Sequence, residues 1–154
     1  MNTKKLTHID EAGNAKMVDV GNKPPMHRKA VARGEFVACA DTLDRLMTGD
    51  LPKGEALAVA RIAGIQAAKR TDEWIPLCHS LPLDCVTVDF SRLNSTTVLV
   101  LASACLTAKT GVEMEALVAV SAACLTLYDM TKAIDKQLKI HNIELVQKTK
   151  TAVG

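Results

Sequence analysis

Asp129 and Lys132 are a carboxylate and an ammonium group three positions apart, at the end of a long apolar stretch. Residues three apart share one face of a helix, so these side chains can form an ion pair or exchange a proton during a reaction. A purely structural ion pair is the alternative interpretation. The spacing therefore predicts either proton-transfer chemistry or a surface salt bridge.

Lys53 follows Pro52, a residue suited to the first position of a helix, and we expect it in the first turn of a helix that continues over residues 56–68. A cation there is unfavourable beside the positive end of the helix dipole. Its position predicts an anionic partner or a functional role. A solvated surface lysine is the simpler alternative.

Cys78 and His79 lie in a loop, residues 75–82, which Pro76 and Pro82 should make rigid. His79 is suited to donating a proton or a hydrogen bond, and a structural histidine is the alternative. Cys78 would act as a nucleophile only where its surroundings lower its pKa. We expect no metal site and no cofactor, because the other histidines have no familiar ligand spacing: His8, His27 and His141.

The stretch from Thr110 to Asp129 predicts a helix with Glu113 and Glu115 in its first turn. Eleven of the thirteen residues between Glu115 and Asp129 are apolar, so we expect this helix to be buried on every side. At about 1.5 Å per residue, Glu115 and Asp129 lie roughly 21 Å apart. One helix cannot bring both to one small substrate, so a shared site would need a second subunit.

The other elements follow from alternation and helix signals. We expect a strand over residues 29–39, a short helix capped by Asp41 and ended by Gly49, and a hairpin of strands 83–90 and 97–106. The second hairpin strand should be buried on both faces. Residues 140–146 predict a last strand before a basic tail. This order indicates an α+β, ferredoxin-like (split βαβ) fold, a four-stranded antiparallel sheet with helices on one face.

We expect a mobile N-terminal arm over residues 1–25, which are polar and carry two glycines and Pro24-Pro25, and a single domain over residues 26–150. A chain of 154 residues has a modest core for so apolar a helix, which favours association into oligomers. The net charge of +2 argues against a nucleic-acid partner.

The absence of a signal-peptide pattern and of an apolar run of about 20 residues argues against a membrane. Five cysteines without a CxxC pair indicate a reducing, cytoplasmic setting without disulfides.

Four segments in order resemble the MoaC family, the cyclic pyranopterin monophosphate synthases of molybdenum cofactor biosynthesis. They are residues 57–65 (LAVARIAGI), 75–79 (IPLCH), 110–117 (TGVEMEAL) and 128–133 (YDMTKA). The resemblance covers about residues 6–148. It implies a lyase that converts a cyclised dihydroguanosine triphosphate to the pyranopterin with release of pyrophosphate, and a ferredoxin-like hexamer, a trimer of dimers with sites between subunits.

The same resemblance implies the site residues. The catalytic positions would be Lys53, His79, Asp129 and Lys132. The substrate-binding positions would be Leu77, Cys78, His79, Glu113, Met114 and Glu115, with Arg28, Lys69 and Lys148 suited to the phosphates. A non-catalytic nucleotide- or pterin-binding module of the same fold is the second hypothesis. A purely structural oligomer, the third, leaves the charged helix ends unexplained.

Overall fold

The computed structural model describes residues 8–153. Its four strands are β1 (Met26–Val37), β2 (Cys85–Arg92), β3 (Thr97–Ala108) and β4 (Lys139–Ala152). They form one sheet in the order β2-β3-β1-β4, and every neighbouring pair is antiparallel. This confirms the predicted α+β, ferredoxin-like architecture.

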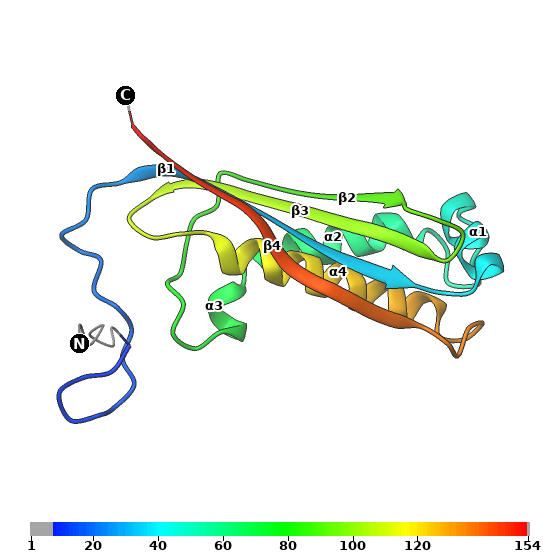
Figure 1. The fold of residues 1–154 in the computed structure, drawn as a ribbon, viewed down its shortest axis with the longest axis horizontal. Helices are drawn as coiled ribbons and strands as arrows, with labels where there is room; N and C mark the ends of the chain where they lie inside the picture. The colour runs from blue at the N-terminus through cyan, green and yellow to red at the C-terminus, as the bar shows by residue number, and fades with distance from the viewer. Residues whose placement is uncertain (1–7, 154) are drawn as a thin grey trace, which may run out of the picture.

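The helices are α1 (Ala40–Thr48), α2 (Ala56–Ala68), the short α3 (Thr71–Trp74) and α4 (Glu113–Thr131). Helices α2 and α4 lie side by side on one face of the sheet (Figure 1). Their contact is close because Gly64 has no side chain: a Cβ atom there would lie 2.8 Å from the backbone oxygen of Ala119. The start of α4 lies at one end of the sheet, and its last turn lies near α1 at the other end (Figure 1).

The core lies between the sheet and the two long helices. Strand β3 alternates, with Val98, Val100, Ala102, Ala104 and Leu106 buried toward the helices. The prediction that this strand is buried on both faces is wrong for the single chain, because Leu101 on the other face is 37% exposed. The outer face of the sheet is thus available to solvent or to a partner.

Helix α4 is buried on the sides that meet the sheet and α2, but not all round. Leu125 is 55% exposed and Tyr128 is 39% exposed, so the expectation of burial on every side is wrong for the single chain. Among the described residues, α4 is the one helix with the length and apolar composition of a membrane span. Core helices of folded domains share that composition, and α4 packs on β1 and β3 as such a helix does.

Most strand ends differ from the sequence predictions by two or three residues, and three other differences are larger or change the place of a named residue. Helix α1 begins at Ala40, so Asp41 lies in its first turn and Cys39 is the cap residue. Helix α2 begins at Ala56, so Pro52 and Lys53 belong to the preceding turn. Strand β4 continues to Ala152, through the predicted tail, because its polar residues pair with β1 along the edge of the sheet.

The predicted arm falls partly outside the described residues, which begin at His8. Residues 8–25 form turns and one isolated bridge between Ile9 and Ala15. Two hydrogen bonds join this segment to the domain: His79 Nε2 lies 2.8 Å from the Val18 carbonyl oxygen, and Lys109 Nζ donates to the Gly21 carbonyl at 2.6 Å. The mobility of the arm stays a prediction.

Candidate functional site

Asp129, in the last turn of α4, lies between two lysines. Lys53 Nζ lies 2.9 Å from Asp129 Oδ2 and donates to the Asp129 backbone carbonyl at 2.8 Å. Lys132 Nζ lies 2.7 Å from Asp129 Oδ1. The structure thus places three of the four predicted catalytic residues in one cluster, the lysine–aspartate triad.

Lys53 reaches this cluster from the turn before α2 and not from the helix itself. Gly54 adopts a positive φ of 86°, and its amide donates to the Leu51 carbonyl at 2.9 Å. The side chain of Lys53 can therefore reach the end of α4. The predicted conflict with the helix dipole is absent, but the predicted anionic partner is present in Asp129.

The two lysines control the charge of the triad. Hydrogen bonds from Lys132 and Lys53 lower the pKa of the Asp129 carboxyl to about 2. The same contact raises the pKa of Lys132 above its usual value. Asp129 is therefore a permanent anion at neutral pH, and it fixes two ammonium groups at the surface of the chain.

Glu115 lies at the opposite end of α4, in a very different environment. It is 3% exposed and lines a cavity of about 380 Å³. Burial, with smaller contributions from the charges of Glu113 and Asp72, raises the pKa of its carboxyl to about 6. Glu115 can therefore exchange a proton close to neutral pH.

The loop that carries Cys78 and His79 forms another wall of the same cavity, which is called the α4 N-terminal pocket below. The pocket brings together the predicted positions at this end of the chain: Leu77, Cys78, His79, Glu113, Met114 and Glu115. A hydrogen bond between His79 Nε2 and the Val18 carbonyl oxygen holds the imidazole ring. Burial raises the pKa of the Cys78 thiol, and the Glu115 carboxylate adds to the rise, so Cys78 lacks the lowered pKa of a nucleophilic cysteine.

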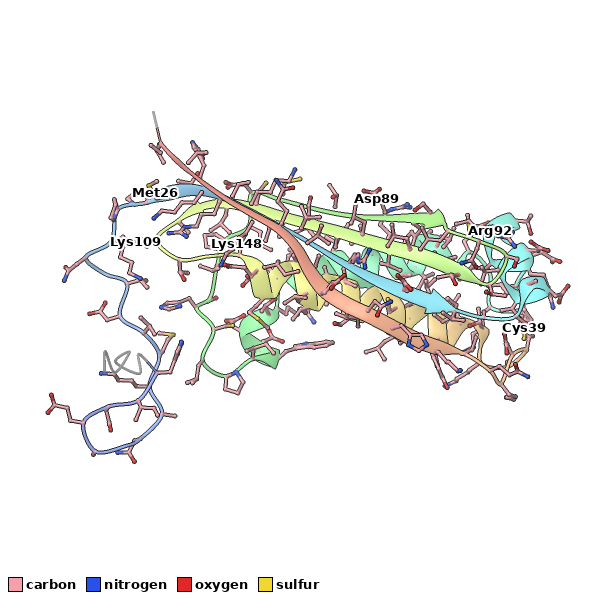
Figure 2. The ribbon with its side chains drawn as sticks, viewed as in Figure 1. Met26, Cys39, Asp89, Arg92, Lys109 and Lys148 are labelled. Atoms are coloured by element: carbon pink, nitrogen blue, oxygen red, sulfur yellow. The ribbon has the colours of Figure 1, made fainter. Side chains whose placement is uncertain are left out.

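A group of cations adjoins this pocket. Arg28, Lys29, Lys148 and Lys150 line a cavity of about 290 Å³, and Gly111 and Glu113 line both cavities. Lys148 Nζ lies 3.1 Å from Glu113 Oε1. Figure 2 shows Lys109 and Lys148 at the end of the sheet where β1 begins at Met26. Two of the three predicted phosphate residues, Arg28 and Lys148, are thus together.

Lys69, the third, is separate. It is the residue at the C-terminal end of α2 and lines none of the cavities described here. The chain also does not unite the lysine–aspartate triad with the α4 N-terminal pocket, since these occupy the two ends of a helix of 19 residues. Within the described residues, no group of three or more histidine, cysteine or acidic side chains is arranged to hold a metal ion.

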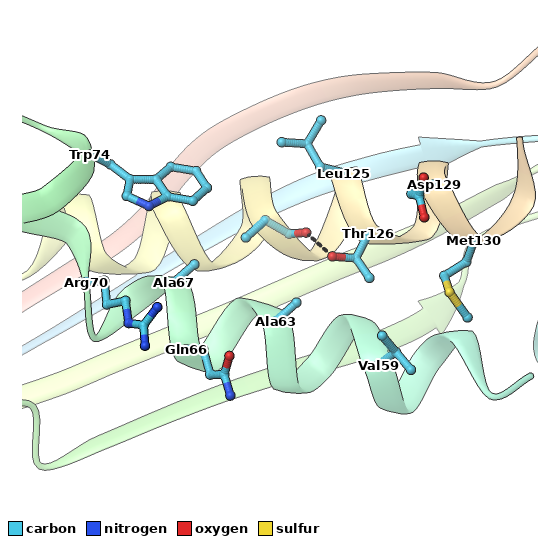
Figure 3. A pocket seen from close by; sticks show the side chains of 11 residues that line it. Val59, Ala63, Gln66, Ala67, Arg70, Trp74, Leu125, Thr126, Asp129 and Met130 are labelled. Carbon is cyan, nitrogen blue, oxygen red and sulfur yellow. Dashed lines mark hydrogen bonds between the residues drawn. The ribbon is translucent and has the colours of Figure 1, made fainter. Parts of the chain in front are cut away.

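A third cavity, of about 450 Å³, runs between α2 and α4 and reaches the triad (Figure 3). Trp74 and Leu125 lie on one side of it, Val59 and Ala63 on the other, and Asp129 and Met130 at one end (Figure 3). Sequence reasoning did not assign a site to this groove. The signal in the sequence is the apolar composition of α2, whose residues Val59 and Ala63 line the groove.

Comparison with known proteins decides the family. The MoaC family model matches residues 17–151. The chain belongs to the MoaC family. Curated MoaC relatives named cyclic pyranopterin monophosphate synthase match almost the whole chain, at 55% identity for the protein of Novosphingobium aromaticivorans, covering 93% of this chain and 90% of that protein.

Two further relatives with the same name agree. The protein of Roseiflexus sp. strain RS-1 is 57% identical, covering 94% of this chain and 92% of its own length. That of Corynebacterium efficiens is 53% identical, covering 94% and 93%. The second half of the described arm, residues 17–25, lies within the segment matched by the MoaC family model, although sequence reasoning assigned it no site residue. Four residues of the described arm line the α4 N-terminal pocket: His8, Val18, Val20 and Lys23.

Proposed function

We propose that this chain is a cyclic pyranopterin monophosphate synthase. Its substrate would be the cyclised dihydroguanosine triphosphate, and its products the cyclic pyranopterin monophosphate and pyrophosphate, in molybdenum cofactor biosynthesis. The observation that carries the proposal is the lysine–aspartate triad, two ammonium groups held on one ionised carboxylate at the end of α4.

The triad suits the chemistry of this reaction. Rearranging a sugar–pterin framework needs groups that accept and donate protons, and release of pyrophosphate needs cations near the developing negative charge. Lys53 donates two of its three N–H bonds to Asp129, which leaves one for a substrate oxygen. In this proposal Asp129 orients Lys53 and Lys132, and the lysines carry the protons.

The α4 N-terminal pocket would bind the pterin part of the substrate. The Glu115 carboxylate can accept hydrogen bonds from the N–H groups derived from guanine. His79 would transfer a proton after the substrate displaces the Val18 carbonyl from its Nε2 atom. Leu77, Cys78, Glu113 and Met114 would form the rest of the wall.

The cations beside this pocket would hold the triphosphate. Arg28 and Lys148 line one cavity with Lys29 and Lys150, so four positive side chains surround one opening. Phosphate oxygens are strong acceptors for such groups. Lys69 would contribute from a neighbouring subunit, since it lies apart from this cavity within the chain.

The complete site would form between subunits of a homohexamer, a trimer of dimers. Glu115 and Asp129 are separated by the length of α4, so a substrate that touches both needs helix ends from two chains. The groove between α2 and α4, with exposed Val59, Trp74 and Leu125, offers apolar surface for that contact. The free cysteines fit a cytoplasmic enzyme.

Incubation of the purified chain with the cyclised triphosphate tests the proposal. We expect stoichiometric pyrophosphate and pyranopterin from the wild-type protein, and no turnover by Asp129→Asn. Asp89→Asn, an exposed acid on β2, is the matched control and should retain full activity. Binding without pyrophosphate release would support the ligand-binding module instead, and full activity of Asp129→Asn would remove that residue from the mechanism.

A further inference from the structure

Cys85 and Cys105 lie directly opposite each other on β2 and β3. Ala104 and Leu106 point into the core, so Cys105, between them, points to the outer face of the sheet. The next outward pair along the same strands is Thr87 and Ser103, whose hydroxyl oxygens are 2.9 Å apart. Side chains of opposite residues on this face therefore meet.

This arrangement satisfies the geometry of a cross-strand disulfide. Opposite residues of an antiparallel pair have Cα atoms about 4.5–5.5 Å apart. A disulfide spans Cα atoms about 4.4–6.8 Å apart. The strands need no change of register for the two sulfur atoms to bond.

We propose that Cys85 and Cys105 form a reversible intramolecular disulfide by exchange with a small-molecule disulfide. The thiolate of Cys85 attacks one sulfur of the external disulfide and releases one small thiol. The thiolate of Cys105 then attacks Cys85 Sγ in this mixed disulfide and releases the second. The two cysteines lose two electrons and two protons in total, and both small thiols leave in the reduced, protonated form.

The surroundings of the two thiols set this order of attack. Cys85 is exposed and Cys105 is partly buried. Burial raises the pKa of the Cys105 thiol, contact with Cys85 raises it further, and the Lys29 ammonium group opposes the rise. The exposed Cys85 meets the oxidant first, and Lys29, opposite Cys105 on β1, stabilises the thiolate that completes the exchange.

The bond would link β2 and β3 at the end of the sheet where two walls of the α4 N-terminal pocket begin. The loop with His79 leads into β2 just before Cys85, and the segment that leads to Glu113 follows β3 just after Cys105. Two hydrogen bonds lie beside this pair: the Asp84 amide donates to the Cys105 carbonyl at 2.9 Å, and the Thr107 amide donates to Asp84 Oδ2 at 3.1 Å. A covalent link would join both walls at their base.

The test uses the full chain in its native assembly, incubated with defined ratios of oxidised to reduced glutathione. After acid quench and alkylation, intact mass and peptide mapping identify the free thiols. We expect the wild-type protein to lose two alkylation sites and two hydrogens, with the peptides of Cys85 and Cys105 linked. Cys39→Ser, which removes an exposed cysteine with no opposite thiol on a strand, should form the same link.

Cys85→Ser provides the decisive comparison. This variant should form no internal bond, and its Cys105 should remain free or carry one glutathione. The midpoint of thermal unfolding should rise on oxidation in the wild-type protein and stay constant in Cys85→Ser. The proposal is overturned if both thiols of the wild-type protein stay alkylatable at every ratio, if each carries glutathione separately, or if either is linked to a different cysteine.

Discussion

The two ends of α4 carry acidic side chains in opposite environments. Glu115, in the first turn, is enclosed by the loop of His79, and burial raises the pKa of its carboxyl to about 6. Asp129, in the last turn, faces solvent between two lysines, which lower the pKa of its carboxyl to about 2. One helix therefore presents an acid that can exchange protons near neutral pH and another that stays ionised.

The difference shows that residue type alone does not assign a chemical role. Both side chains are carboxylates at the end of one apolar helix, yet desolvation dominates at one end and charge pairing at the other. The proposed site uses both carboxylates: Glu115 would bind the pterin part of the substrate, and Asp129 would hold Lys53 and Lys132 beside the reacting groups.

Lys53→Ala should have the largest effect. It removes the ammonium group that contacts both the carboxylate and the backbone carbonyl of Asp129, so we expect turnover to fall about a thousand-fold, within the usual range for loss of a general acid or base. Pyrophosphate release measures it. Lys139→Ala, an exposed lysine at the start of β4, is the control with expected wild-type turnover. Near-normal turnover of Lys53→Ala would contradict a catalytic role for the C-terminal end of α4, because the triad would then be structural.

Mixed oligomers test whether the two helix ends serve one site. Glu115→Ala and Asp129→Ala should each be inactive alone. Co-expressed in equal amounts, they should recover about a quarter of wild-type activity, because hybrid interfaces contain one site with both native residues. Activity per milligram of the purified mixture measures the recovery. Mixtures as inactive as the single variants would place each complete site within one chain.

Glu115→Gln should stabilise the folded protein. The folded-state pKa of about 6 lies above the ordinary value of 4.5, so the wild-type protein loses stability as pH rises through this window. The amide carries no such penalty, and the free energy of unfolding at pH 7 should rise by about 2 kcal/mol at most. Urea unfolding at pH 4 and pH 7 checks this. Asp89→Asn, an exposed acid on β2, should retain the wild-type pH dependence; an equal gain at both pH values in Glu115→Gln would contradict the assignment.

The sign is opposite for Asp129. Its folded-state pKa lies below the ordinary value of 3.8, so its contribution to stability is present above that pH and is lost as pH falls through about 2. Carbon-detected NMR titration of the carboxyl groups should resolve the two midpoints. In Lys53→Ala the Asp129 midpoint should move upward and that of Glu115 should not; a common shift would mean that the two ends are electrostatically linked.

Lys148→Ala should have the smallest effect. Its ammonium group is exposed and paired with Glu113, and one cation among four in the cavity should change KM about fivefold with little change in kcat. The salt dependence of KM, compared with Lys139→Ala as control, checks that the loss is electrostatic. A large loss of kcat would assign Lys148 to the reacting groups instead.

Sequence reasoning predicted the sheet and α4 well because their patterns are strong. The alternation along β1 and β3 and the apolar run of α4 follow directly from burial against one layer. The triad was predicted only in part: the spacing of Asp129 and Lys132 predicted their contact, but Lys53 was placed in the wrong element. Proline suits the first turn of a helix and also a tight turn, and Gly54 with its positive φ selects the turn.

Other features of the structure could not be predicted, because they leave no pattern in the sequence. Strand β4 is exposed along most of its length, so its lysines and threonines resemble a tail. The contact of Val18 with His79 joins segments 61 positions apart through a backbone carbonyl, which is the same in every residue type. The register that places Cys85 opposite Cys105 depends on the hairpin turn, not on either cysteine.

The close contact at Gly64 limits how this sequence can drift over evolutionary time. A side chain there would meet the Ala119 backbone at 2.8 Å and Val88 at 3.0 Å, and neither α4 nor the sheet can move aside without displacing the other. Ala60 and Ala67 are buried on the same helix as Gly64, so these three positions admit only the smallest residues. A larger side chain at any of these positions would therefore force α2 away from α4 and the sheet.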